Sequence, residues 1–192
     1  MGARSEPPRR YSGLQKALHW TMAALIAAQV ALGIAMTNLG EGPLTNNLYE
    51  LHKSVGIMVL ALALVRLLVR ARRGAPPFEP MPEWQRRAAN ASHTALYVLF
   101  IATPLVGWVA TSYCCKPVNF LWTVPMSLPV PDAPTMEAAG WIFRIHIALA
   151  FALLGVVAVH VAGALQHHFI RRDRTLLRML PGGASERTPS PR

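Results

Sequence analysis

The chain has 192 residues, of which 53% are hydrophobic and only 15% are charged, whereas about 25% are charged in an average soluble domain. This balance argues against an ordinary soluble protein, and the length suits about one domain. The net charge of +10 does not indicate a nucleic-acid partner, because the positive residues gather in a few connections between apolar segments, as membrane topology requires.

Four apolar segments follow one another and predict membrane-spanning helices, since about 20 apolar residues cross a bilayer core of ~30 Å. We expect the helices at about 14–37, 45–72, 84–113 and 138–170. The second segment is free of charge only from Ser54 to Val65. Arg66 and Arg70 lie near its end, where we expect their long side chains to extend to the lipid headgroups.

Positive residues are concentrated before the first helix, between the second and third, and after the fourth. Because such segments stay on the cytoplasmic side, we expect four crossings of a bacterial inner membrane with both termini in the cytoplasm. The first helix lacks the cleavage pattern of a signal peptide, so we expect it to be retained. The predicted fold is an all-α integral membrane protein, an antiparallel four-helix transmembrane bundle over 1–180 with a disordered cytoplasmic tail at 181–192.

The third helix and the connection after it carry three further features. Pro104 is expected to kink the helix. Residues 119–128, NFLWTVPMSL, form an apolar stretch that we expect on the outer membrane surface. Cys114 and Cys115 are the only cysteines. Because adjacent cysteines rarely form a relaxed disulfide, we expect no essential role for this pair.

Four histidines are expected inside the bundle at two depths. His146 and His160 are 14 residues apart, close to four whole turns, so they share one face of the fourth helix. His19 opens the first helix at its cytoplasmic end, and His52 opens the second at its outer end. Because neighbouring helices run in opposite directions, His19 is level with His160, and His52 is level with His146.

Two facing pairs of neutral imidazoles in an apolar bundle suit the axial positions of b-type haem iron. A single histidine in a membrane helix could simply bond a neighbouring carbonyl or hydroxyl, but four at two matched depths favour a cofactor. Zinc or a di-metal centre would need carboxylates or cysteines, and Glu50 is the single candidate at these depths. The absence of a C-x-x-C-H motif argues against covalent haem attachment.

Five segments carry a resemblance to a known family. They are SGLQKALHW, LHKSVGIMVLALALVRLLVR, SHTALYVLFIATPLVGW, HIALAFALLGVVAVHVAGALQHHFI and DRTLLRMLP. In this order they resemble the bacterial cytochrome b-561 family along nearly the whole chain, and within it the branch described as superoxide oxidases. The resemblance implies two b haems, with His19 and His160 at the inner haem and His52 and His146 at the outer haem.

The family also implies a quinone pocket near one haem. His167 lies seven residues after His160, about two turns, hence on nearly the same face, and we expect it to contact the quinone. His168 is rotated away. Both could instead serve as interfacial anchors. His93 could compete with His160 for the inner iron.

The predicted function is an oxidoreductase that takes electrons from superoxide at the periplasmic face and passes them through both haems to ubiquinone. It would need the bilayer but no partner protein. The outer cations Lys53, Lys116 and Arg144 could attract the anion, or pair with haem propionates. Two other functions stay open: a cytochrome b subunit that relays electrons between a dehydrogenase or hydrogenase and quinone, and an acceptor for a periplasmic electron carrier.

Overall fold

The computed structural model describes residues 10–114, 118–126, 128 and 135–182. Four long helices make up most of this part of the chain: α1 (Gly13–Asn38), α2 (Pro43–Arg73), α3 (Glu83–Cys114) and α4 (Met136–Gln166). Among the same residues a π-helical turn, η1 (His167–Arg171), continues α4, and two short strands, β1 (Val118–Phe120) and β2 (Val124–Met126), follow α3.

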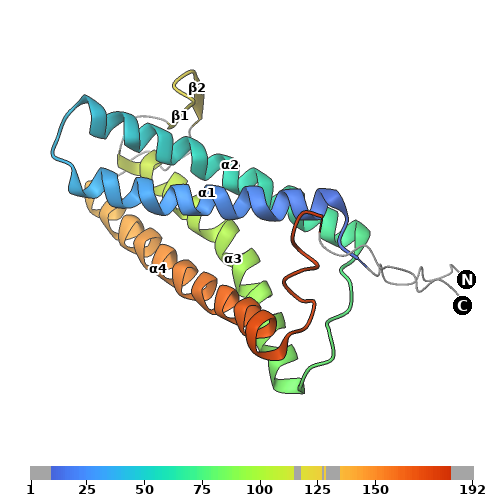
Figure 1. The fold of residues 1–192 in the computed structure, drawn as a ribbon. Coiled ribbons are helices and arrows are strands. Elements are labelled where there is room, and N and C mark those ends of the chain that lie inside the picture. Colours follow the sequence, from blue (N-terminus) through green and yellow to red (C-terminus); the bar gives the residue numbers. More distant parts are fainter. Residues whose placement is uncertain (1–9, 115–117, 127, 129–134, 183–192) are drawn as a thin grey trace, which may run out of the picture.

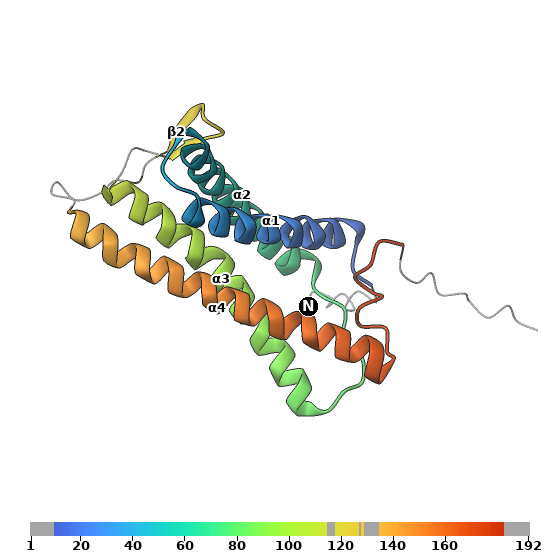
Figure 2. The ribbon, with the colours of Figure 1, turned by 60° about the vertical axis from the view of Figure 1, so that its left-hand side comes forward.

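The helices lie side by side in alternating directions (Figures 1 and 2). α3 packs along α4, α1 packs along α2, and α2 also meets α3. Each of these helices is long and apolar enough to cross a membrane, which confirms the predicted four-helix membrane fold. We call the end that holds the start of α1 and the end of α4 the inner end, and the opposite end the outer end.

Local sequence signals explain where these helices begin and end. The Ser12 hydroxyl accepts from the Gln15 backbone while the Gln15 side chain accepts from the Ser12 backbone, a capping box that starts α1. Gly74, with φ of 69°, ends α2 in a conformation that glycine adopts without strain. Pro104 lies inside α3 without ending it.

The buried core is small and lies where the helices meet. Its fully buried members are Met22, Val59, Ala63, Leu96, Phe100 and Leu153. Many large apolar side chains point outward instead: Phe151 is 70% exposed and Val159 is 65% exposed. Such a surface would be a liability in water, but it matches the hydrocarbon that surrounds a membrane helix.

A two-stranded hairpin stands beside the outer end of α2 (Figures 1 and 2). Its strands are antiparallel, with Val118 opposite Met126. The Leu121 N–H donates to the Ser54 hydroxyl at 2.9 Å, and Ser54 is fully buried. Leu121 and Trp122 at the tip are about half exposed. The placement of residues 119–128 on the membrane surface stays a prediction, and residue 127 lies outside the described part.

Cys114 is the last residue of α3. It is disulfide-bonded rather than a free thiol, and the expectation that the cysteine pair has no essential role stays a prediction. Cys115 lies outside the described residues.

Replacing Ser54 with alanine should loosen the hairpin. The substitution removes the acceptor of the Leu121 N–H, and a typical hydrogen bond contributes about 0.5–1.5 kcal/mol to stability. We expect faster chymotrypsin cleavage at the tip of the hairpin in the purified protein. Ser92→Ala is the matched control, because the buried Ser92 hydroxyl has no hydrogen-bond partner in the described part of the chain. Equal cleavage of both variants would contradict the role of Ser54 as the anchor.

Candidate haem-binding sites

The four histidines expected at the haems form two pairs in the structure. The ring centroids of His52 on α2 and His146 on α4 are 6.2 Å apart. Those of His19 on α1 and His160 on α4 are 6.3 Å apart. The 14-residue step between His146 and His160 separates the two levels by about 21 Å along α4. The fold therefore brings together the predicted pairs, one toward each end of the bundle.

The spacing within each pair suits an iron atom between two imidazoles. A metal–nitrogen bond of about 2 Å on each side, added to the half-widths of two rings, separates the ring centroids by about 6 Å. The measured separations of 6.2 and 6.3 Å agree with this. The ring planes meet at 85° at the outer level and 61° at the inner level. Two histidines that held an iron could differ in this way, because each ring would be free to turn about its bond to the metal.

The ring of His146 at the outer level is held in one orientation by a hydrogen bond. Its Nδ1 lies 2.9 Å from the Thr103 carbonyl oxygen, so Nδ1 carries the proton and donates it to that oxygen. Nε2 then keeps its lone pair for a metal, the arrangement commonly found around metal-bound histidines. Gly107 provides the room, because a Cβ at that position would lie 2.8 Å from Nδ1 of His146.

His19 at the inner level has a different neighbour. An Nη2 nitrogen of Arg66 lies 2.9 Å from Nδ1 of His19. Because a guanidinium only donates, Nδ1 acts as an acceptor here, and a neutral ring then carries its proton on Nε2. Binding of haem iron at Nε2 therefore requires the guanidinium to leave Nδ1. Arg66 points into the bundle, where its Cζ lies 5.7 Å from the centre of the Tyr97 ring. The expectation that its side chain extends to the headgroups is therefore wrong.

His93 on α3 adds a third imidazole at the inner level. Its ring centroid is 5.4 Å from that of His160, and its other face stacks on Phe78 at an interplanar angle of 8°. Its Nδ1 is buried without a hydrogen-bond partner in the described part of the chain. The competition between His93 and His160 for the inner iron therefore stays open.

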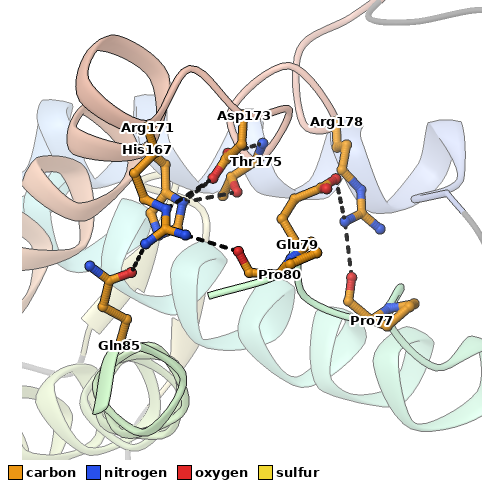
Figure 3. A network of polar contacts seen from close by, with 9 residues as sticks. All are labelled: Pro77, Glu79, Pro80, Gln85, His167, Arg171, Asp173, Thr175 and Arg178. Carbon is orange, nitrogen blue, oxygen red and sulfur yellow. Dashed lines mark hydrogen bonds and ion pairs between the residues drawn. The ribbon is translucent and has the colours of Figure 1, made fainter. Parts of the chain in front are cut away.

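His167 and His168 differ in their surroundings. His167 is buried, with 7% exposure, and its Nδ1 lies 2.5 Å from Oδ2 of Asp173 (Figure 3). His168 is only partly buried and its ring rests on the neighbouring Phe169. His167 is thus the more buried of the two, while the quinone contact and the interfacial anchoring both stay predictions.

The Asp173 carboxylate lies beyond the helical part of the span. Burial by itself would raise the pKa of Asp173, but hydrogen bonds from His167 and Thr175 outweigh burial and hold that pKa below its usual value. The group is therefore ionised at neutral pH.

The outer cations are placed as follows. Lys53 forms an ion pair with Glu50 on the same helix, so part of its charge is already neutralised. The Arg144 guanidinium lies 4.6 Å from the centre of the Trp141 ring. Lys116 lies outside the described residues. Attraction of an anion by these residues stays a prediction.

Sequence reasoning did not single out Thr103, Gly107, Arg66 or Asp173 as parts of a site. Asp173 had a detectable signal, since it is the one acid within the basic run IRRDR. Gly107 and Thr103 had none, because their importance comes from a contact between α3 and α4.

Comparison with known proteins identifies one family and several relatives of this chain. Residues 10–182 match the family described as prokaryotic cytochrome b561. The chain is 34% identical over 185 residues to cytochrome b561 homolog 2 of Escherichia coli K12, covering 93% of this chain and 95% of that protein. It is 30% identical over 180 residues to a probable superoxide oxidase, CybB, of Yersinia pestis, covering 90% of this chain and 97% of that protein.

Replacing Gly107 with alanine should displace His146. The added Cβ would lie far inside contact distance of the ring, so the ring must move away and lose its bond to the Thr103 carbonyl. We expect a marked loss of the haem held at this level, measured as haem per protein by pyridine haemochrome spectra. Gly140→Ala is the control, because nothing lies within 4 Å of a Cβ there. Full haem content in Gly107→Ala would argue against His146 as a ligand in this orientation.

Proposed function

Because the chain belongs to the prokaryotic cytochrome b561 family, a family of membrane electron-transfer proteins with b-type haem, we propose that it oxidises superoxide and reduces ubiquinone. It is a multi-pass inner-membrane protein with oxidoreductase-type activity. In the proposed reaction two superoxide anions each give up one electron at the periplasmic face. Ubiquinone takes up both electrons and two protons to form ubiquinol.

The observation that carries the proposal is the pair of imidazole levels along α4. His52 and His146 lie toward the outer end, and His19 and His160 lie toward the inner end. Two b haems bound at these levels, the number that the four ligands allow, would supply one-electron redox centres across the membrane. Such an arrangement would allow electron transfer from a donor near the outer level to an acceptor near the inner level. The relative named as a probable superoxide oxidase supports superoxide as the donor.

The proposed acceptor site lies at the inner end, at His167. A quinone carbonyl needs a hydrogen-bond donor, and His167 is a buried imidazole two turns beyond His160. Its Nδ1 is hydrogen-bonded to Asp173, which leaves Nε2 for a ligand. His168, exposed in part, is a weaker candidate. We therefore place the ubiquinone headgroup against His167, with both chain termini and this end of the bundle on the cytoplasmic side.

The experiment that tests the proposal uses the protein purified without any partner. Superoxide generated enzymatically should reduce the haems, and added ubiquinone-1 should be reduced in turn by the same sample. Turnover by the isolated protein supports the proposed function. Haem spectra without turnover would favour the alternative, a cytochrome b subunit that relays electrons between a partner dehydrogenase or hydrogenase and quinone.

Histidine variants should separate the two haems. We expect His52→Ala and His146→Ala to lose the outer haem, and His19→Ala and His160→Ala to lose the inner haem, because the ligands lie at two levels. Acid acetone extraction and pyridine haemochrome spectra should count about two haems in the parent and about one in each variant. Identical spectra for His19→Ala and His52→Ala would contradict the two-level arrangement.

His93→Ala is the informative companion at the inner level. If His160 is the ligand, this variant keeps its inner haem. Loss of that haem in His93→Ala, together with its retention in His160→Ala, would assign the iron to His93 instead.

Lys116→Glu should slow the reaction with superoxide. A cation near the outer haem raises the local concentration of an anion, and the effect weakens with salt. Lys53 is a poorer probe because it pairs with Glu50 and neighbours His52. We expect slower haem reduction by superoxide with a shallower salt dependence, an unchanged haem content and little change with a neutral donor. An unchanged rate at low ionic strength would exclude Lys116 from steering and leave Lys53 and Arg144.

A further inference from the structure

The inner end of the bundle contains a carboxylate–imidazole pair that haem ligation does not use. Oδ2 of Asp173 lies 2.5 Å from Nδ1 of His167. Oδ1 of the same carboxylate accepts the backbone N–H of Thr175 at 2.9 Å, and the Thr175 hydroxyl lies 3.4 Å from Nδ1. One oxygen is thus fixed by the backbone while the other faces the ring (Figure 3).

The backbone itself brings these two side chains together. α4 ends in the π-helical turn η1, and Arg172 after it has a left-handed φ of 55°. The chain therefore turns back, and the Asp173 N–H donates to the His167 carbonyl at 3.2 Å. Left-handed backbone is costly for a residue other than glycine, and π-helical turns occur frequently at functional sites.

The segment that carries Asp173 is fixed at several points. We call residues 172–182 the C-terminal strap. Lys16 and Trp20 of α1 donate to the carbonyls of Leu180 and Met179 at 3.0 and 2.8 Å. The Arg178 guanidinium donates to the Pro77 carbonyl and to Glu79 at 2.9 and 3.1 Å (Figure 3). The strap is thus tied to α1 and to the connection between α2 and α3, which holds Asp173 in place.

One further charge faces the pair. The Arg171 side chain comes within 3.7 Å of Oδ2 of Asp173, while its guanidinium donates to Gln85 of α3 and to the Pro80 carbonyl. Arg171 thus competes in part with His167 for the carboxylate. Exposure differs across the pair: the side chain of Asp173 is 18% exposed and that of His167 only 9%. Asp173 is therefore the member with better access to water.

We propose that Asp173 is a positioning residue that holds His167 as the proton donor for quinone reduction at the inner face. This inference rests on the proposed ubiquinone site at His167. The carboxylate accepts the proton on Nδ1 and stabilises the doubly protonated ring. While Nδ1 keeps the proton that it donates to Asp173, Nε2 carries a proton to give away only in the doubly protonated ring.

The proposed reduction at His167 balances in protons and electrons. Reduction of ubiquinone to ubiquinol takes two electrons, delivered from the haem side, and two protons. His167 gives a proton from Nε2 to a carbonyl oxygen of the quinone as that oxygen gains charge. Nδ1 keeps the proton that it donates to Asp173, so the neutral ring regains a proton at Nε2 from water after the protonated quinone oxygen has moved away. A second cycle supplies the second proton, and neither residue is changed at the end.

The test follows the oxidation of reduced haem by ubiquinone-1, so it does not depend on superoxide as the donor. The protein is reduced with dithionite, freed of excess reductant and mixed with ubiquinone-1 in a stopped-flow instrument between pH 6 and 8.5. We expect Asp173→Asn to be about tenfold slower at pH 8, below the 10²–10⁴-fold range typical of general acid–base catalysis. The deficit should shrink toward pH 6, because bulk protons then protonate the ring without help from the carboxylate.

Two variants separate a chemical role from a structural one. Glu79→Gln breaks an ion pair between the strap and the α2–α3 connection but leaves Asp173 and His167 untouched, so its pH profile should match the parent. Asp173→Glu keeps the charge and should recover part of the rate. Haem spectra should stay unchanged in all three. An Asp173→Asn profile parallel to that of the parent, or a loss equal to that of Glu79→Gln, would overturn the inference.

His167→Ala distinguishes this inference from the proposed function. If His167→Ala oxidises as fast as the parent, ubiquinone does not bind at His167, and both proposals for this end fail. If His167→Ala is slow while Asp173→Asn behaves like Glu79→Gln, the quinone site stands and only the role of Asp173 is refuted.

Discussion

The burial of imidazole rings in an apolar bundle is the constraint on which this structure depends. A polar ring in a membrane interior needs a partner, and α4 places two such rings on one face, four turns apart. α1 and α2 then each deliver one histidine to meet them, from opposite ends. The depth at which each pair lies follows from this placement.

The two levels are prepared to different degrees. At the outer level the ring of His146 is set by the Thr103 carbonyl and by the space at Gly107, so a ligand-ready nitrogen exists in the fold itself. At the inner level Arg66 occupies Nδ1 of His19, and His93 lies beside His160. Binding of a haem there would require these side chains to rearrange.

The ends of the bundle are closed by backbone contacts rather than by large apolar interfaces. At the outer end the hairpin is fixed to α2 through Ser54, two residues after His52. At the inner end the C-terminal strap is held by cationic and indole side chains that donate to its carbonyls. The helix flanks between them expose large apolar side chains, which leaves polar chemistry to the two ends. Donor and acceptor are accordingly proposed at opposite ends.

The sequence by itself determined the fold class, the family and the pairing of histidines by depth. These rest on local regularities, the length of the apolar segments and the helical period between His146 and His160, which a chain carries wherever it folds. The tertiary structure decided the rest. Arg66 turns inward because His19 of another helix offers an acceptor, and Gly107 matters because His146 packs against α3. Asp173 meets His167 because a π-helical turn and a left-handed residue reverse the chain. Contacts between distant segments and departures from regular helix do not repeat along the sequence, so hydrophobic and helical periodicity does not predict them.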